Sequence, residues 1–162
     1  MSRQSILRSL LALMFSLCAS SALAQMPNPY GAPISLENAK KAAAAAVAEA
    51  RKIHVPMAVA ITDTAGDLVY FEKMDATQTG SVNVAIGKAR SAALYKRSTK
   101  VWYDAVAAGG AGLRVLGLEG AVPIEGGLPL IVDGKLVGAI GLSGGSGAQD
   151  GQCAQAGADS VK

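Results

Sequence analysis

The stretch AVPIEGGLPLIVDGKLVGAIGLSGGSGAQD, residues 121–150, decides the fold. It holds two apolar runs on either side of Asp133-Gly134, and an Asp-Gly pair between such runs is a strong hairpin signal because both residues tolerate a positive φ. The sequence therefore predicts paired strands at residues 128–132 and 135–142.

Two glycines inside the second run, Gly138 and Gly141, present no side chain. We expect another backbone, a helix or a ligand to approach the strand closely at these positions. Beyond the run, Ser146 and Gln149 have the spacing of a capping box, which predicts that a final helix begins there.

Upstream, the alanine-rich segment after Ser35 predicts a helix that ends before Pro56. Residues 57–62 and 68–74 are expected to form a first hairpin, with Gly66 in the left-handed conformation at its turn. Helical spacing begins again at Ser81, and Ser98 is expected to cap a shorter helix. The predicted remainder is a loop at 111–120 and a fifth strand at 121–125.

This order of elements predicts an α+β domain. We expect a single, mostly antiparallel, five-stranded sheet with helices packed on it, in one domain that spans residues 35–162. Residues 25–34 contain prolines and are expected to form an extended N-terminal arm.

The first 24 residues have the features of a secretory signal peptide. Arg3 and Arg8 precede an apolar run, and Ala22-Leu23-Ala24 forms an A-x-A cleavage site. The run is too short to span a bilayer. We therefore expect a periplasmic or secreted protein without a membrane span. Cys18 leaves a lipid anchor open as an alternative, although Leu17 is bulky for such a signal.

Removal of the signal peptide changes the charge balance. The chain has 15 basic and 12 acidic residues, and cleavage removes two arginines but no acid. The mature protein is therefore nearly neutral, which argues against a nucleic-acid partner. Cleavage also leaves Cys153 as the single cysteine, so no intramolecular disulfide is expected.

Three motifs together resemble the GlcG/HbpS family, whose members are also called haem-degrading domains and are related to the C-terminal domain of PduO. They are VPMAVAITDTAGDLVYFEKMD at 55–75, IGKARSAALYKRST at 86–99 and GGLPLIVDGKLVGAIGLSGG at 126–145. The resemblance implies a sandwich similar to profilin or PAS domains, a homo-oligomer, and haem or a related tetrapyrrole as ligand.

His54 is the only histidine of the chain. One imidazole is enough for an axial haem ligand, whereas His54 and Cys153 are too few for the usual zinc site. A purely structural role is the alternative. His54 would then lie at a helix end, with its positively charged form facing the last carbonyl groups of the helix. The resemblance itself transfers no ligand role to His54.

Lys88 lies in a basic cluster on and after the helix that begins at Ser81, and it matches the family's helix motif. Haem propionates or a carboxylate metabolite would suit such cations. Glu125, Gly126 and Gly127 precede a strand, and the glycine pair exposes backbone amides that can hold an anion. A solvated helix face and a tight corner are the structural alternatives for the two groups.

We therefore expect a secreted or periplasmic haem-binding protein for sequestration, delivery or sensing. The candidate ligand-binding residues are His54, which is also the candidate iron ligand, Lys88, Glu125, Gly126 and Gly127. Two alternatives stay open. One is an enzyme or accessory protein that acts on a small carboxylate metabolite, and the other is a ligandless homo-oligomeric assembly module.

Overall fold

The computed structural model describes residues 28–162, so the predicted signal peptide lies outside the described residues. In chain order the elements are α2 (Leu36–Lys52), β1 (Ala58–Thr62), β2 (Leu68–Lys73), α3 (Ser81–Tyr95), α4 (Thr99–Ala108), the 3₁₀ helix η1 (Gly110–Gly117), β3 (Gly127–Val132), β4 (Lys135–Ser143) and α5 (Gly147–Asp159). None of these helices is both long and apolar enough to cross a membrane.

The four strands form one antiparallel sheet in the order β2-β1-β4-β3. Each hairpin supplies one central and one edge strand, and β1 pairs with β4 in the middle. Asp133 and Gly134 both have positive φ, as the hairpin turn requires. The predicted α+β class with an antiparallel sheet is confirmed.

The fifth strand predicted at residues 121–125 is wrong, because this segment carries no ladder. Pro123 has no amide hydrogen to donate to a neighbouring strand. The amide of Val122 instead donates to Ser91 Oγ on α3 at 3.1 Å. Residues 121–125 therefore pack on α3 and do not join the sheet, which has four strands.

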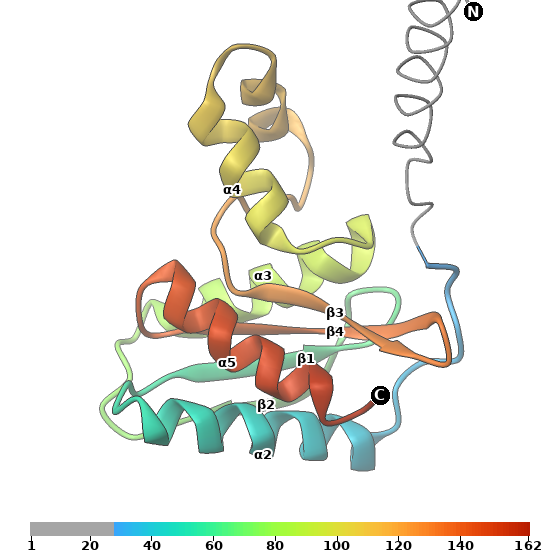
Figure 1. The fold of residues 1–162 in the computed structure, drawn as a ribbon, viewed down its shortest axis with the longest axis vertical. Coiled ribbons are helices and arrows are strands. Elements are labelled where there is room, and N and C mark those ends of the chain that lie inside the picture. Colours follow the sequence, from blue (N-terminus) through green and yellow to red (C-terminus); the bar gives the residue numbers. More distant parts are fainter. Residues whose placement is uncertain (1–27) are drawn as a thin grey trace, which may run out of the picture.

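The loop predicted at residues 111–120 is also wrong in part, because η1 occupies most of it. Gly109 and Gly110 have positive φ, which lets the chain reverse directly after α4. A Cβ on Gly112 would lie 1.9 Å from the carbonyl oxygen of Ala105. Glycine there lets η1 lie against the backbone of α4, and the two form an arm, residues 99–117, that projects from the sheet (Figure 1).

Helices cover both faces of the sheet (Figure 1). On one face α2 and α5 lie side by side and bury the main core with Val59 and Ile61 of β1. Ala58 and Ala60 point to the opposite face, where they meet α3. This alternation is what a strand with two covered faces requires.

Close packing around β4 depends on its glycines. A Cβ on Gly141 would lie 2.2 Å from the carbonyl oxygen of Ala85 on α3, and one on Gly138 would lie 2.2 Å from the carbonyl oxygen of Thr62 on β1. The prediction that another backbone approaches this strand is confirmed at both positions. The capping box of Ser146 and Gln149 at the start of α5 is confirmed too.

Residues 28–34 run along β4 beyond the end of β1. The amide of Gly31 donates to the carbonyl of Leu136, and the amide of Leu136 donates to the carbonyl of Pro29. The Tyr30 hydroxyl donates to the carbonyl of Ala93 at the end of α3. These bonds hold the N-terminal segment against the sandwich.

Candidate functional site

A buried ion pair lies at the end of β4, between α3 and α5. The ammonium of Lys88 donates to Asp150 Oδ2 at 2.6 Å and to the backbone carbonyl of Leu142 at 2.8 Å. The Lys88 and Asp150 side chains are only 1% and 3% exposed. The second carboxylate oxygen of Asp150 accepts from the amide of Gly145 at 3.0 Å.

The glycine pair predicted as an anion site covers this ion pair. A Cβ on Gly126 would lie 2.9 Å from the ammonium nitrogen of Lys88, and one on Gly127 would lie 2.5 Å from its carbonyl oxygen. Gly126 also has a φ of 122°, which side chains disfavour. Only glycine therefore fits this corner.

The backbone groups of the corner bond within the protein. The amide of Gly127 donates to Thr99 Oγ1 at 2.9 Å, and the carbonyl of Gly126 accepts from the amide of Leu142. Glu125 is half-buried, and its side chain lies beside Gly147 and Gly151 in the first turns of α5. A carboxylate is favoured there by the helix dipole.

The electrostatics of the ion pair are those of a desolvated site. Burial raises the pKa of Asp150 above its ordinary value, while the hydrogen bonds from Lys88 and from the Gly145 amide oppose this rise. The structure thus brings Lys88, Gly126 and Gly127 together, with Glu125 next to them. In this arrangement Lys88 is engaged by Asp150 and does not reach the surface.

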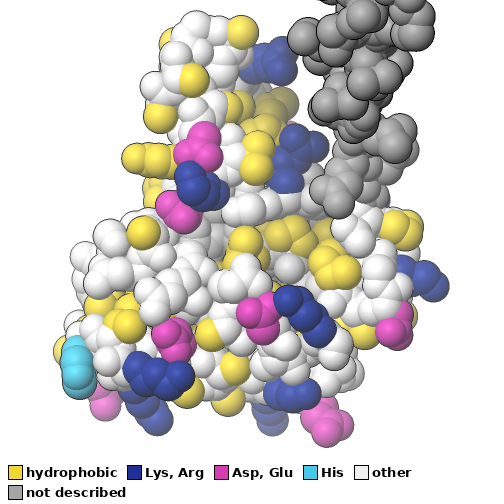
Figure 2. All heavy atoms as spheres, in the orientation of Figure 1, with side chains coloured by type: hydrophobic (Ala, Val, Ile, Leu, Met, Phe, Trp, Pro, Cys, Tyr) yellow, Lys and Arg dark blue, Asp and Glu magenta, His cyan; other side chains and the backbone are white. Residues whose placement is uncertain are grey.

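His54 lies just beyond the end of α2 and outside this corner. It follows the helix by two residues, has a φ of 55° and is exposed. Figure 2 shows its imidazole, coloured cyan, standing at the surface. A shallow hollow of about 300 Å³ surrounds it, which we call the His54 hollow; it is lined by Ala50, Arg51, His54, Val55, Pro56 and Met74.

A second hollow of about 320 Å³ shares Arg51 and Met74 with the first and adds Glu72, Lys73 and Asp75. The two hollows therefore form one surface that is apolar around the imidazole and charged on the Lys73 side. The thioether of Met74 lies between them and accepts the amide hydrogen of Met57 at a sulfur–nitrogen distance of 3.4 Å.

The sequence did not indicate that Asp150 pairs with Lys88, or that Met74 lies beside His54 in one hollow. Asp150 belongs to the first turn of a predicted helix, but no spacing rule connects it with Lys88, which is 62 residues away. Met74 ends a strand pattern and looks like any apolar residue there. Within residues 28–162, no group of three or more histidine, cysteine or acidic side chains could hold a bare metal ion.

Comparison with known proteins gives consistent matches. The family model described as haem degrading protein HbpS-like matches residues 34–159. Protein GlcG of Escherichia coli K12 is 36% identical over 110 residues, which are 68% of this chain and 81% of GlcG.

Two solved structures have the same fold. A double mutant of HbpS from Streptomyces reticuli has a TM-score of 0.74 and 30% identity, with 82% of this chain and 89% of that chain covered. The structure described as a PduOC:heme complex has a TM-score of 0.72 and 30% identity, with 80% and 96% covered.

Proposed function

Since this chain belongs to the family of HbpS-like haem-degrading proteins, we propose that it binds haem or a related tetrapyrrole, for sequestration, delivery or sensing. The observation that carries the proposal is the haem complex of PduOC, a relative with the same fold. A shared fold alone would be weak support, because one fold hosts many functions. Haem binding therefore also requires side chains in this protein that suit the group.

The His54 hollow offers such side chains. An imidazole is a common ligand of haem iron in proteins, and in some of them a methionine thioether is the second ligand. His54 presents an exposed imidazole in the part of the surface that is lined mainly by apolar atoms, and Met74 borders the same hollow. The donor set and the apolar lining both fit a haem group, so we assign the iron contact to His54.

Charged groups at the rim suit the propionates of haem. Arg51 borders both hollows, and Lys73 borders the second one. Guanidinium and ammonium groups bind carboxylates through charge-assisted hydrogen bonds. When bound, haem would supply its own redox and ligand chemistry, while Arg51 and Lys73 orient the group and His54 contributes the imidazole nitrogen.

Lys88 and the glycine corner have a different role in this proposal. Because Lys88 is engaged by Asp150 and covered by Gly126, we assign it a structural role and no contact with the ligand. The same burial removes support from the alternative in which Lys88 and the corner amides hold a small carboxylate metabolite. That alternative would require the ion pair to open first.

We also propose that the protein acts in the periplasm or outside the cell as a homo-oligomer. The signal-peptide pattern supports the location. The arm supports self-association because it carries four exposed large apolar side chains, and exposed apolar clusters mark interaction surfaces. These residues are Val101, Tyr103, Leu113 and Leu116. A second copy of the chain is the partner we assign to this surface.

Titration of the purified protein with hemin tests the proposed function. We expect a saturable Soret band, and a rise in melting temperature because hemin binds the native state. The double variant Arg51→Gln/Lys73→Gln should bind hemin more weakly. Lys40→Gln/Lys41→Gln, which changes two exposed lysines on α2, is the matched control and should bind as the parent does. The proposal fails if no saturable spectrum appears.

A further inference from the structure

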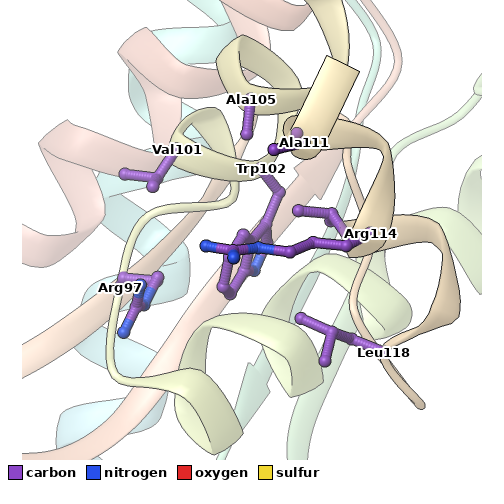
Figure 3. Close-up of a pocket in the computed structure, with 9 residues that line it drawn as sticks. Arg97, Val101, Trp102, Ala105, Ala111, Arg114 and Leu118 are labelled. Carbon is purple, nitrogen blue, oxygen red and sulfur yellow. The ribbon is translucent and has the colours of Figure 1, made fainter. Parts of the chain in front are cut away.

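A cavity lies at the base of the arm, between α4, η1 and the segments that flank them (Figure 3), and it shares no lining residue with the His54 hollow. Its volume is about 400 Å³, and it is open to solvent. The lining comes from the segment between α3 and α4, from α4, from η1 and from the residue after η1: Arg97, Val101, Trp102, Ala105, Ala111, Gly112, Arg114, Val115 and Leu118. Nothing proposed for haem at His54 uses these residues.

Trp102 forms the floor of the cavity and is 8% exposed. Its indole meets Tyr95 edge to face, with ring centroids 5.4 Å apart. The Tyr95 hydroxyl donates to the carbonyl of Glu119, and this hydrogen bond fixes the Tyr95 ring against the indole. Among the described residues the indole Nε1–H has no hydrogen-bond partner. A buried donor without a partner is rare in folded proteins and calls for a physical reason.

Two arginines line the cavity together with this indole. The guanidinium carbon of Arg97 lies 4.8 Å from the centre of the Trp102 ring, and Arg114 lines the same cavity (Figure 3). Within residues 28–162 neither arginine is in an ion pair with a carboxylate. The lining thus has two cations, no anion, and otherwise apolar or glycine residues.

We propose that this cavity binds a planar organic anion, an aromatic carboxylate, beside Trp102. A flat ring gains by packing against the apolar lining and on a guanidinium plane, and a guanidinium group binds a carboxylate with two parallel hydrogen bonds. The unpartnered Nε1–H is a further donor that an oxygen of the ligand satisfies once the side chains adjust. Arg97 Nε already donates to the carbonyl of Tyr95 at 3.0 Å, but a neutral aromatic molecule would leave both guanidinium groups without a carboxylate.

Two kinds of ligand could present this carboxylate to the cavity. One is a small aromatic acid that the cavity encloses. The other is the propionate-bearing edge of a tetrapyrrole, in which case the cavity adds a second contact region to the proposed function. The site itself depends on Arg97, Trp102 and Arg114, and it does not depend on His54.

The single tryptophan makes the cavity directly observable. Trp102 is the only tryptophan in the sequence, so intrinsic tryptophan fluorescence reports on this one site. Benzoate should change the fluorescence saturably, while benzamide, which has the same ring without the charge, should bind at least about tenfold more weakly. Isothermal titration calorimetry supplies the same affinities without the fluorophore.

Variants separate this site from binding elsewhere. Arg97→Gln and Arg114→Gln should each weaken benzoate about tenfold, and Trp102→Phe, followed by calorimetry, should weaken it through loss of the N–H. Arg51→Gln is the matched control, because it removes an arginine that borders other hollows. It should leave benzoate binding unchanged.

Protoporphyrin IX, measured by competition against benzoate in the His54→Ala variant, distinguishes these two kinds of ligand. Displacement that needs Arg97 and Arg114 identifies the tetrapyrrole edge, and benzoate binding without displacement identifies a small acid. The proposal is overturned if benzamide binds as well as benzoate, if Arg51→Gln weakens benzoate as much as Arg97→Gln does, or if neither benzoate nor protoporphyrin IX binds.

Discussion

Lys88 and Asp150 join helices from opposite faces of the sheet through a 2.6 Å contact between the ammonium and the carboxylate. Lys88 comes from α3, and Asp150 comes from the first turn of α5. Both side chains are buried at the end of β4, beneath Gly126. The pair therefore fixes how the two helical layers meet at this end of the molecule.

Removal of one partner should be far more damaging than removal of an exposed ion pair. Asp150→Asn leaves a buried ammonium without a counter-charge, so we expect a loss of about 3–5 kcal/mol in the free energy of unfolding. Urea denaturation measures it. Asp104→Asn, which breaks the exposed pair with Lys100, is the control and should change little. Equal costs for the two variants would contradict a structural role for the buried pair.

Gly141 should tolerate no side chain. Gly141→Ala places a Cβ against the backbone of α3, and overpacking of this kind costs about 1–3 kcal/mol or more. Gly117→Ala is the control, because no atom lies within 4 Å of its added Cβ. Thermal unfolding of both variants measures the difference. A melting temperature for Gly141→Ala equal to that of the control would show that α3 does not pack this closely on β4.

Cys153 should make stability fall at high pH. Burial raises the pKa of its thiol from 9.0 to about 11, with smaller contributions from Glu49 and Asp150. Because the folded pKa exceeds the unfolded one, this contribution is complete below pH 9 and is lost as the pH rises toward about 11. The parent should lose more stability over that range than Cys153→Ala does. Parallel pH profiles for the two would refute the burial of the thiol.

Self-association should depend on the arm. Leu116 is 64% exposed on η1, and Leu116→Glu places a charge in the surface assigned to a second copy. Analytical ultracentrifugation should show a smaller particle for this variant than for the parent. Leu36→Glu, at a 53% exposed leucine on α2, is the control and should leave the mass unchanged. If the parent protein is itself a monomer, the proposal that the arm mediates self-association is wrong.

Local signals in the sequence predict much of the fold. The hairpin turn depends only on the two residues Asp133 and Gly134, and the capping box of α5 depends on four consecutive residues. The glycines of β4 correctly indicate a close neighbour, because a strand interior gains nothing from glycine unless another group must approach it. Residues 121–125 mislead because an apolar run resembles a strand until Pro123 is weighed as a break in the ladder.

The candidate site is harder to predict because its contacts are long-range. Lys88 stands out in the sequence, but its burial depends on Asp150 and Gly126, which are distant along the chain. A lysine on a helix carries no sign that its charge will be enclosed. The cavity at the base of the arm escapes prediction for the same reason, since Arg97, Trp102 and Arg114 converge only because η1 folds back on α4.

The central claim is that His54 holds haem in the His54 hollow, and the hemin spectrum of His54→Ala tests it most directly. The variant is expected to stay folded, because the imidazole is exposed and its removal opens no cavity. If the claim is right, the Soret band of the parent is shifted or lost in His54→Ala at equal hemin concentration. An unchanged band position and affinity in the variant would contradict it.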